Sequence, residues 1–562
     1  MVKETVLSCN IAAHLPARAA ELPYKQAVVV PVGRDKSGRV TWSHLTFLQL
    51  NTLSDRYALG LERMGVKRGT RTVLMVKPSL EFFALVFALF KIGTVLVLID
   101  PGLDRKAVLK CFKEVAPEAF IGIPAAHVAR LLFRDSFSTV QVNVTVGKRL
   151  FWGGFTLEDV AEAGKAVGED RPYVMAQTRP DEVAALLFTS GSTGIPKGAV
   201  YTHGIFDAQL RLLRQTYQFG EDEKELATFP LFALFDPALG MTCVVPDMDA
   251  SKPGSADPVK LVEAIEDHGV TSMFGSPALL DRLGQYCVHH NKVLIPLRRV
   301  ISAGAPVRSD ILERMNRSLP PQAQVFTPYG ATESLPVSNI GSHELLGETR
   351  QRTAQGEGIC VGKPVDEQLV RIIRITDDAI EGWSDDLLVS PGEIGEITVR
   401  GPVVTTSYYA RPEQTRLAKI QEGAQVVHRM GDVGWLDAQG RLWMCGRKSH
   451  RVQTTEGPLF SVPVEEIIHQ HPEVKRAALV WRGQAPAQTP VVLLERQPGS
   501  SRSDEVLLQE VRALAAAHPL TARIRHFMIY SQPFPVDIRH NAKIAREKLA
   551  DWLAQQPLRE GI

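Results

Sequence analysis

One segment of the chain combines small, hydroxyl-bearing and cationic side chains in a pattern suited to binding phosphate. It follows the apolar run Ala184–Phe188 and reads Thr189-Ser190-Gly191-Ser192-Thr193-Gly194-Ile195-Pro196-Lys197. Glycines let backbone N–H groups approach an anion, hydroxyls add donors, and the lysine supplies positive charge. A flexible surface turn is the alternative interpretation. We favour phosphate binding because the segment lies between a predicted buried strand and a predicted amphipathic helix.

The spacing within this segment excludes one familiar class of phosphate-binding enzyme. A Walker A loop has four variable positions between its two glycines and continues with Lys and then Ser or Thr. Here Gly198 follows Lys197, and the distance from Gly191 differs. A P-loop kinase or ATPase is therefore not predicted.

The segment resembles the phosphate loop of the adenylate-forming superfamily, which contains acyl-CoA synthetases, adenylation domains of peptide synthetases, and luciferases. Further motifs similar to those of this superfamily occur downstream, in the superfamily's own order. They are Gly304-Ala305-Pro306, Tyr329-Gly330-Ala331-Thr332-Glu333, Gly392–Glu396 with Arg400-Gly401, Gly431-Asp432, Gly446-Arg447, and Asn541-Ala542-Lys543-Ile544. Alone, the glycines among them are also typical of ordinary turns. Because the motifs all occur, and in the superfamily's order, chance does not explain the match.

The resemblance implies that the chain uses Mg²⁺ and ATP to convert a carboxylic acid into an acyl-AMP. It places adenine at Gly304-Ala305-Pro306 and assigns Tyr329, Gly330 and Ala331 to the nucleotide site. By the same resemblance, Glu333 coordinates Mg²⁺, a hard ion that prefers oxygen ligands.

The remaining roles are implied for four further side chains. Thr332 would donate a hydrogen bond to the α-phosphate, and Asp432 would accept hydrogen bonds from the ribose hydroxyls. Arg447 would help to hold the nucleotide. Lys543 would lie against the α-phosphate and acyl oxygens, where negative charge builds during attack. An isolated lysine at a polar helix start is more often a solvated charge.

Four positions depart from the superfamily pattern. Pro230-Leu231-Phe232 is followed by Ala233 where histidine is common, and we expect the smaller side chain to open space near the acyl site. Ser449 replaces the usual hinge acid or lysine, Met430 replaces the threonine before Gly-Asp, and Ala542 replaces the glycine before the lysine. These changes argue against a standard two-conformation thioesterification cycle and leave adenylation intact.

Longer strings resemble one branch of the superfamily, the β-lactone synthetases of bacterial long-chain olefin biosynthesis. The strings are Pro533–Lys543, Leu98–Gly102 and Phe229–Asp236. The branch implies a 2-alkyl-3-hydroxyalkanoic acid as substrate and a β-lactone, AMP and pyrophosphate as products. It also implies association with other olefin-pathway enzymes. Asp236 and His203 are unranked candidates for taking the hydroxyl proton, although His203 suits a helix start better.

Two other functions are weighed against this one. A long-chain acyl-CoA ligase shares the first half-reaction and differs in needing CoA. A catalytically inactive nucleotide-binding scaffold is the alternative from another class. Retention of Glu333, Asp432 and Lys543 together argues against the scaffold.

The elements that must position these residues alternate between strand-like and helical patterns. Buried strands are predicted at Thr72–Met75, Thr94–Leu98, Ala184–Phe188, Ser272–Phe274 and Val300–Ser302. Phe206, Leu210, Leu213 and Tyr217 recur on one helical face just after the glycine-rich segment. Strand, loop and helix in this order predict an α/β fold with mixed and parallel sheets flanked by helices. Alternation near Gly395–Gly401 predicts a smaller antiparallel module.

The C-terminal part is predicted to be a separate, mobile α+β unit. Its expected elements are helices at Pro463–His469, Asp504–Ala517 and after Asn541, with strands at Ala477–Trp481, Val491–Glu495 and Phe527–Tyr530. We therefore expect an adenylating body over residues 1–446 and a lid carrying the lysine over residues 447–562.

Bulk properties limit the remaining functions. With 64 Lys+Arg against 62 Asp+Glu in 562 residues, the chain lacks the basic field that nucleic acid binding needs. Its six cysteines are scattered singly, which favours reduced thiols in a cytoplasmic protein. No signal peptide is predicted. The apolar stretch Phe82–Ile99 is interrupted by Lys91, so we expect a buried helix and strand and no transmembrane segment.

Overall fold

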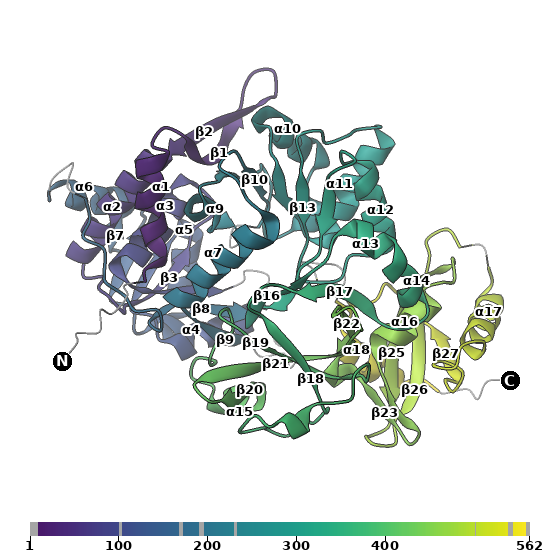
Figure 1. The fold of residues 1–562 in the computed structure, drawn as a ribbon. Helices are drawn as coiled ribbons and strands as arrows, with labels where there is room; N and C mark the ends of the chain where they lie inside the picture. The colour runs from purple at the N-terminus through teal and green to yellow at the C-terminus, as the bar shows by residue number, and fades with distance from the viewer. Residues whose placement is uncertain are drawn as a thin grey trace.

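The computed structural model describes residues 9–99, 104–167, 172–189, 196–229, 233–500, 502–537 and 543–557. These ranges form a large α/β body with a smaller unit at its side, made of the C-terminal residues (Figure 1). The phosphate-segment residues Ser190, Gly191, Ser192, Thr193, Gly194 and Ile195 lie outside the described ranges, as do Pro230-Leu231-Phe232 and Asn541-Ala542.

The first sheet of the body is parallel except at one edge. Its strand order is β7-β6-β5-β3-β4-β8-β9, and β9 alone runs antiparallel to its neighbour. The strands are β3 (Arg71–Met75), β4 (Val95–Ile99), β5 (Ala119–Gly122), β6 (Val142–Thr145), β7 (Phe155–Thr156), β8 (Val183–Thr189) and β9 (Lys197–Thr202).

The second sheet is also parallel except at one edge. Its order is β14-β13-β12-β10-β11-β1-β2, with β2 antiparallel to β1 at the edge. The strands are β1 (Gln26–Arg34), β2 (Val40–Thr46), β10 (Lys224–Ala227), β11 (Thr242–Val244), β12 (Ser272–Phe274), β13 (Arg299–Ile301) and β14 (Gln324–Phe326).

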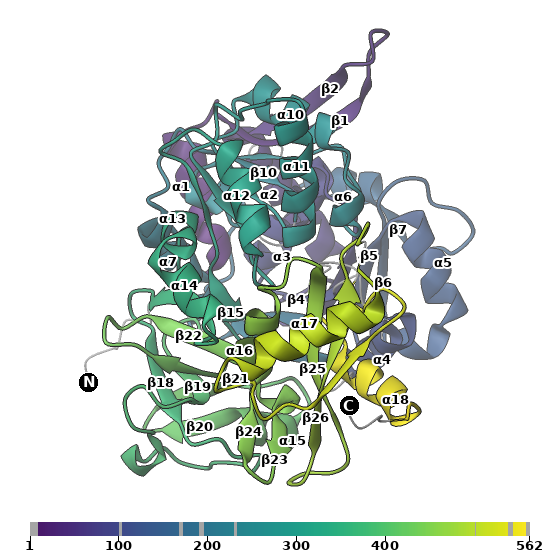
Figure 2. The same ribbon diagram turned by 90° about the vertical axis from the view of Figure 1, so that its right-hand side faces the viewer.

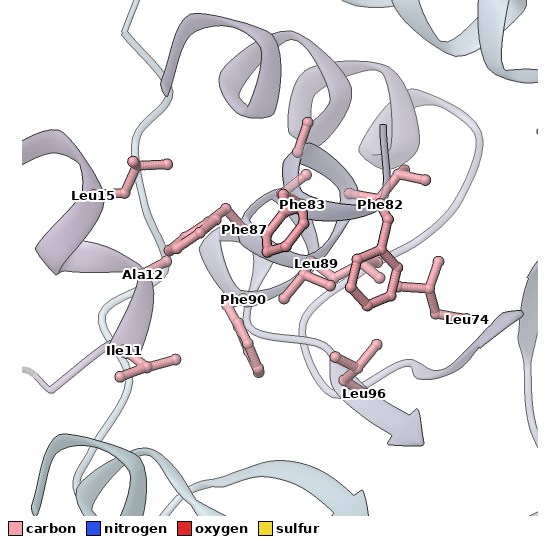
Figure 3. Close-up of a cluster of buried hydrophobic side chains, with 14 of the residues drawn as sticks. Ile11, Ala12, Leu15, Leu74, Phe82, Phe83, Phe87, Leu89, Phe90 and Leu96 are labelled. Atoms are coloured by element: carbon pink, nitrogen blue, oxygen red, sulfur yellow. The ribbon is translucent and has the colours of Figure 1, made fainter. Parts of the chain in front are cut away.

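Helices cover these two sheets, and one that is deeply buried is α3 (Leu80–Ile92). Every residue from Phe82 to Ile92 is buried, and its phenylalanines fill the core shared with β3 and β4 (Figure 3). Lys91 lies inside this core, where its ammonium donates to Asp55 Oδ1 at 2.5 Å and Ser54 Oγ at 2.7 Å. Gly93, at φ +77°, ends the helix before β4.

The buried helix followed by a strand confirms the interpretation of Phe82–Ile99. Among the described residues, no helix is both long and apolar enough to cross a bilayer.

The other helices of the body are α1 (His14–Glu21), α2 (Phe47–Arg63), α4 (Arg105–Val115), α5 (Pro124–Leu132), α6 (Leu157–Lys165), α7 (His203–Tyr217), α9 (Asp236–Leu239), α10 (Pro258–His268), α11 (Pro277–His289), α12 (Ser309–Arg317), α13 (Ser342–Leu346), α14 (Glu348–Ala354) and α15 (Pro412–Ala418).

A third sheet, antiparallel throughout, contains the module expected near Gly395. Its order is β15-β16-β17-β22-β21-β19-β18, and β20 pairs with β21. The strands are β15 (Tyr329–Ala331), β16 (Ser334–Asn339), β17 (Ile359–Pro364), β18 (Leu369–Ile373), β19 (Gly395–Arg400), β20 (Lys419–Glu422), β21 (Gln425–Leu436) and β22 (Leu442–Arg447).

The C-terminal unit begins directly after β22 and packs beside the third sheet (Figure 2). Its elements are β23 (Val452–Thr454), β24 (Gly457–Leu459), α16 (Ser461–Ile468), β25 (Val474–Arg482), β26 (Thr489–Arg496), α17 (Asp504–Ala516), β27 (His526–Ile529) and α18 (Arg546–Ala554). The strands form the sheet β25-β26-β27. Every helix and strand predicted for this part is present, with ends that differ by a few residues.

The structure corrects one local prediction. The glycine-rich segment does not lead directly into a helix, because Lys197 begins β9 and pairs with Thr189 across an antiparallel hairpin. The helix α7 starts only after β9, at His203. In the run Lys197–Thr202, apolar and polar residues alternate too weakly to indicate a strand. The sequence pattern therefore does not predict β9.

Candidate functional site

A large cavity receives residues from the body and from the C-terminal unit. It encloses about 2300 Å³. The predicted site residues among its lining are Lys197, Gly304, Gly330, Ala331, Thr332, Glu333, Arg447 and Lys543. Residues more than three hundred positions apart in the sequence therefore meet around one space.

Glu333 lies in the turn between β15 and β16, and hydrogen bonds fix both its side chain and its backbone. Tyr408 Oη donates to Glu333 Oε1 at 2.6 Å. The backbone oxygen of Glu333 accepts from the Thr405 amide at 2.9 Å and from Thr405 Oγ1 at 3.2 Å. Burial and the neighbouring carboxylate raise the pKa of Tyr408, so its hydroxyl stays a donor. One oxygen of the Glu333 carboxylate is thus held in place.

Thr332, the residue before it, is positioned through its backbone. Tyr201 Oη, from β9, donates to the Thr332 carbonyl at 2.5 Å. Burial raises the pKa of Tyr201, which keeps this phenol protonated at neutral pH. The hairpin that carries the glycine-rich segment is therefore tied directly to the turn that carries Thr332 and Glu333.

Lys419, on β20, places a buried amino group behind Glu333. Its Nζ donates to Thr405 Oγ1 at 3.2 Å and lies 5.8 Å from the centre of the Tyr408 ring. Burial lowers the pKa of Lys419 to about 7, and the charge of Glu333 opposes that shift. Burial also lowers the pKa of the neighbouring His428 well below its usual value, so His428 is neutral.

Asp432 and Arg447 face each other on neighbouring strands, β21 and β22. Arg447 Nε lies 3.2 Å from Asp432 Oδ1, and Tyr329 Oη donates to Asp432 Oδ2 at 2.7 Å. The carboxylate of Asp432 is buried, and its charge raises the pKa of Arg447. Each carboxylate oxygen retains a second lone pair, so two adjacent hydroxyls can still bind to it.

The glycines of two motifs are required by local geometry. Gly304 follows β13 at φ +95°, a backbone conformation that favours glycine, and Ala305-Pro306 continue from it. A Cβ on Gly330 would lie 2.6 Å from the Ser334 carbonyl oxygen. Gly304 and Gly330 thus let the chain turn tightly where it lines the cavity.

Lys543 enters the cavity from the C-terminal unit, just before α18. Its backbone amide donates to Asp537 Oδ1 at 2.9 Å, and the Asp537 amide donates to the Lys543 carbonyl at 3.1 Å. Behind it, Arg546 forms a buried ion pair with Glu465 of α16 at 2.6 Å. Lys543 therefore belongs to a segment that is held in place by contacts with the core of the C-terminal unit.

The two described ends of the glycine-rich segment also lie near this site. Thr189 closes β8, and Lys197 opens β9 with its Nζ 5.2 Å from the centre of the Tyr408 ring. Tyr408 thus lies between Lys197, Lys419 and Glu333. The ammonium of Lys197 is in reach of a negatively charged ligand in the cavity.

One part of the cavity wall is apolar. This part includes Phe82, Val86, Phe87 and Phe90 of α3, together with residues of β4, α5, α7 and α9. Ala233 is buried and lies outside the lining, whereas its neighbours Leu234 and Phe235 contribute to the wall. The expectation that Ala233 itself widens the acyl site stays a prediction.

Gln209, on α7, lines the cavity and has a buried side-chain oxygen without a hydrogen-bond partner among the described residues. Its Nε2 donates to the Leu335 carbonyl at 2.9 Å, while its Oε1 is buried and has no hydrogen-bond partner within the described ranges. A buried acceptor without a donor costs free energy. The Gln209 amide also lies within hydrogen-bond reach of the Tyr201 hydroxyl, and a hydroxyl in the cavity could donate to Oε1 only after a small movement of the side chain, because Oε1 is shielded from solvent.

Asp236 and His203 both lie outside the lining of the large cavity. Asp236 is buried on α9, and burial raises its pKa well above the usual value. Burial lowers the pKa of His203 to about 4, and its Nδ1 accepts from the Ile11 amide at 3.3 Å. His203 is the first residue of α7, as its position in the sequence indicated.

The junction between β22 and the C-terminal unit also borders the cavity. Lys448 and Ser449 both line it. Lys448 Nζ lies 3.1 Å from Glu396 Oε1 and donates to the Thr376 carbonyl at 2.8 Å. Lys448 thus forms a charge contact with β19 directly beside the serine that replaces the usual hinge residue.

Sequence reasoning missed Tyr408, Thr405, Lys419 and Gln209. These residues lie on loops, strand ends and a helix outside the motifs, and they reach the site only through tertiary packing. The adjacent pair Tyr408-Tyr409 offered a weak signal, because an aromatic pair in a loop often anchors it. Nothing in the sequence pattern distinguishes Gln209 from other polar residues of α7.

Comparison with known proteins places the chain in a family. Residues 15–409 match the model of the AMP-binding enzyme family. The chain is 50% identical over 555 residues to an olefin beta-lactone synthetase of Xanthomonas campestris, covering 98% of both chains. It is also 50% identical to an olefin beta-lactone synthetase of Stenotrophomonas maltophilia, again covering 98% of both. A long-chain-fatty-acid–CoA ligase of Thermus thermophilus is 26% identical over 82% of each chain.

Solved structures agree on the fold. The amide bond synthetase McbA from Marinactinospora thermotolerans superposes with a TM-score of 0.78 at 21% identity, covering 97% of this chain and 99% of that one. O-succinylbenzoate coenzyme A synthetase from Bacillus subtilis superposes with a TM-score of 0.71 at 21% identity, covering 98% of this chain and 99% of that one. The chain belongs to the AMP-binding enzyme family of adenylate-forming ligases and, within it, to the group that contains the olefin beta-lactone synthetases.

Proposed function

We propose that the chain activates a 2-alkyl-3-hydroxyalkanoic acid with ATP and closes it to a β-lactone. The observation that carries this proposal is the cavity itself, which brings Thr332, Glu333 and Lys543 together with the apolar side chains of α3 in one lining. The 50% identity to two olefin beta-lactone synthetases over 98% of the chain supports the same reaction.

In the first step a carboxylate oxygen attacks the α-phosphorus of ATP, and the bond to pyrophosphate breaks. Asp432 would accept hydrogen bonds from the ribose, and Gly304-Ala305-Pro306 would border the adenine. Lys197, Thr332 and Lys543 would hold the phosphates and stabilise the negative charge that builds at the α-phosphate. The products of this step are the acyl-AMP and pyrophosphate.

Glu333 is the residue that would hold Mg²⁺. No cluster of three or more His, Cys, Asp or Glu side chains suited to a metal occurs among the described residues. One carboxylate is nevertheless sufficient, because Mg²⁺ keeps several waters and takes its other ligands from substrate phosphates. Bound there, the ion would neutralise phosphate charge, while Tyr408 holds the carboxylate in place.

In the second step the β-hydroxyl oxygen attacks the acyl carbon, its proton is released, and the bond from that carbon to AMP breaks. The nucleophile is already tethered to the electrophile, so little further ordering is needed. Gln209 Oε1 is a suitable acceptor to orient the hydroxyl, because no group in the described part of the chain donates to it. The second step then takes place in the first active site, consistent with Ser449 at the hinge position.

We extend the same proposal to domain organisation and context. Residues 1–446 form the adenylating body, and residues 447–562 form a lid that brings Lys543 to the phosphates. A cytoplasmic location and association with other olefin-pathway enzymes belong to the proposal, as does the expectation that neither nucleic acid nor a transmembrane segment is involved.

Mass spectrometry of the product tests the reaction. The purified protein is incubated with ATP, magnesium and a synthetic long-chain 2-alkyl-3-hydroxy acid, with and without CoA. We expect a product lighter than the acid by one water in both samples, together with AMP and pyrophosphate. A thioester formed only with CoA would instead establish an acyl-CoA ligase.

A further inference from the structure

The large cavity follows the carboxyl-terminal ends of the strands in both parallel sheets. Its lining includes residues at or just after the ends of β5, β3, β4 and β8 in the first sheet, and of β14, β13, β12, β10 and β11 in the second. Ligands of open α/β sheets commonly bind along this edge. The order of the strands therefore shows which residues lie toward either end of the cavity.

One end of the cavity contains the nucleotide motifs. Gly304 follows β13 and Gly330 comes just after β14, the two strands at one edge of the second sheet, and Lys197 opens β9 at an edge of the first. Strands β3 and β11 are several places away from these strands in the two sheets. The lining residues that follow β3 and β11 therefore lie toward the end remote from the nucleotide motifs.

Two loops form this remote end. They are named the β3 loop, residues 75–78, and the β11 loop, residues 245–253, and every residue of both loops lines the cavity. Leu74, which precedes the β3 loop, and Val245, which begins the β11 loop, belong to one buried hydrophobic cluster. The two loops thus start from the same core, one from each sheet.

Charges act between the two loops. Hydrogen bonds from Ser251 lower the pKa of Asp249 in the β11 loop, and the charges of Lys252 and Lys77 lower it further. Lys77 belongs to the β3 loop, so its ammonium acts on Asp249 from the other side of the cavity. Both residues are exposed, and interactions between exposed charges contribute little to stability. The two loops can therefore separate at little cost.

Residues of both loops line the cavity and also contact solvent. Met75 is 36% exposed, and Lys77 and Asp249 are exposed as well. A side chain with both properties marks an opening. Asp377, which pairs with Arg451 of the C-terminal unit, is likewise exposed and lines the cavity. In the described part of the chain, the cavity thus opens beside the C-terminal unit and again between the β3 and β11 loops, at a place named the loop opening.

An apolar face of α3 connects the loop opening with the interior. Phe82, Val86 and Phe90 are spaced four positions apart, so they lie on one side of the helix, and all three line the cavity. Phe82 is in the first turn of α3, beside Leu74 of β3 (Figure 3). Phe90 is in the last turn. The helix therefore presents apolar groups along the cavity, starting at the β3 loop.

Aromatic contacts continue this apolar face to the reacting groups. Phe90 packs on Phe206 with ring centroids 5.7 Å apart, and Phe206 packs on Tyr201 with centroids 5.0 Å apart. Tyr201 Oη donates to the Thr332 carbonyl at 2.5 Å. All four residues line the cavity. A series of lining residues in contact thus runs from α3 to Thr332, and it is apolar as far as the Tyr201 hydroxyl.

We propose that the loop opening is the entrance for a long alkyl chain of the acid, and that the far part of the bound chain lies between the two loops. A chain in contact with Phe82, Val86 and Phe90 would leave water for an apolar surface, while its carboxylate lies near Thr332. An open end sets no sharp upper limit on chain length. The assignment of this entrance rests on the proposed function only in that the ligand is a long-chain acid, whichever product is formed.

A removable bridge between the two loops tests the proposal. Lys77→Cys with Asp249→Cys is treated with a bifunctional maleimide whose spacer contains a disulfide, so that reductant cuts the bridge. The first measurement needs no reaction: binding of a long-chain fatty acid with a fluorophore at its terminal carbon, followed by fluorescence anisotropy. We expect the native chain to bind this acid, because the fluorophore stays outside the opening. The bridge should slow binding by about tenfold or more until reductant is added.

The second measurement is pyrophosphate exchange with a long-chain and with a short-chain 3-hydroxy acid. The bridge should lower exchange with the long acid relative to the short acid by about tenfold or more, because a short acid can enter beside the C-terminal unit. The single cysteine variants and the native chain receive the same reagent as controls. Arg39→Cys with Asp267→Cys is the matched bridge, since these exposed residues pair between β1–β2 and α10 outside the cavity lining.

Three results would overturn the proposal. The first is a bridged variant that binds the labelled acid as fast as the reduced variant, and the second is a native chain that binds the unlabelled acid and rejects the labelled one. The third is a bridge that lowers exchange with both acids equally. If the native chain exchanges pyrophosphate with no acid, yet binds the labelled acid at a rate that the bridge slows, the proposed function fails and the entrance stands.

Discussion

Tyr408 donates a hydrogen bond of 2.6 Å to the carboxylate of Glu333, although the two residues lie 75 positions apart in the sequence. The bond joins the loop before α15 to the turn between β15 and β16. It fixes one oxygen of the carboxylate and leaves the other for a cation. The relationship makes Tyr408 a positioning residue for Glu333.

Replacement of Tyr408 should therefore weaken magnesium binding. In Tyr408→Phe the ring remains and the donor is lost, which typically costs about 1.5–3 kcal/mol for a bond to a charged group. We expect the magnesium concentration for half-maximal pyrophosphate exchange to rise by about tenfold or more. Tyr409→Phe is the control. An unchanged magnesium requirement in Tyr408→Phe would show that Glu333 does not need this support.

Lys419 should make magnesium binding depend on pH. Burial lowers its pKa to about 7, so the side chain is cationic below that pH and neutral above it. A cation near Glu333 repels Mg²⁺, so the apparent affinity for magnesium should rise as the pH increases through about 7. ATP protonation contributes to the same trend and must be separated from it.

The variant Lys419→Met provides that separation, because it removes the cation and retains the apolar length of the side chain. Magnesium titrations of pyrophosphate exchange from acidic to alkaline pH should show a flatter dependence in this variant. Parallel curves for the native chain and the variant would contradict the assignment of the pH effect to Lys419.

Gln209 should favour acids that carry a β-hydroxyl. Its Oε1 lacks a donor within the described ranges, and we expect the side chain to turn so that Oε1 accepts a hydrogen bond from such a hydroxyl. Sites built around a buried acceptor discriminate strongly against analogues that lack the donor. In Gln209→Leu, pyrophosphate exchange with the 3-hydroxy acid should fall relative to exchange with the 3-deoxy acid by about 10- to 100-fold. Because both acids are measured with the same variant, a loss of folded protein lowers both exchange rates equally and leaves their ratio unchanged. A ratio equal to that of the native chain would remove Gln209 from the site of the hydroxyl.

Lys543 should be needed for the first step. Lys543→Ala removes the ammonium from the α-phosphate, and loss of one such charge-stabilising group typically costs about 100- to 1000-fold in rate. The measurement is exchange of labelled pyrophosphate into ATP. Lys548→Ala, an exposed lysine of α18, is the matched control. If Lys543→Ala retains exchange and fails only to release AMP, the lysine acts in the second step.

Elements and motifs are more predictable from the sequence than the contacts between them. Buried strands such as β3 and β12 and the amphipathic helix α7 follow from local periodicity, so their positions are predictable. The meeting of Glu333, Arg447 and Lys543 around one cavity is predicted by resemblance to a family. By contrast, β9 is not predicted, because six residues at the edge of a sheet carry little periodic signal.

The supporting residues of the site could not be predicted, for a physical reason. Lys419 and Thr405 act through burial and through hydrogen bonds that exist only after β20 and its preceding loop pack behind Glu333. In the sequence, Lys419 resembles any surface lysine after a helix. Its lowered pKa arises from the tertiary environment, which composition and spacing do not encode.

The origin of one oxygen atom tests the proposed reaction most directly. A 3-hydroxy acid labelled with a heavy oxygen isotope in both carboxylate positions is converted by the native chain, and the AMP and lactone are analysed by mass spectrometry. If the carboxylate attacks the α-phosphorus and the β-hydroxyl then displaces AMP, each product carries one label. AMP without label, together with a lactone that retains both labelled oxygens, would contradict carboxylate activation and with it the proposed reaction.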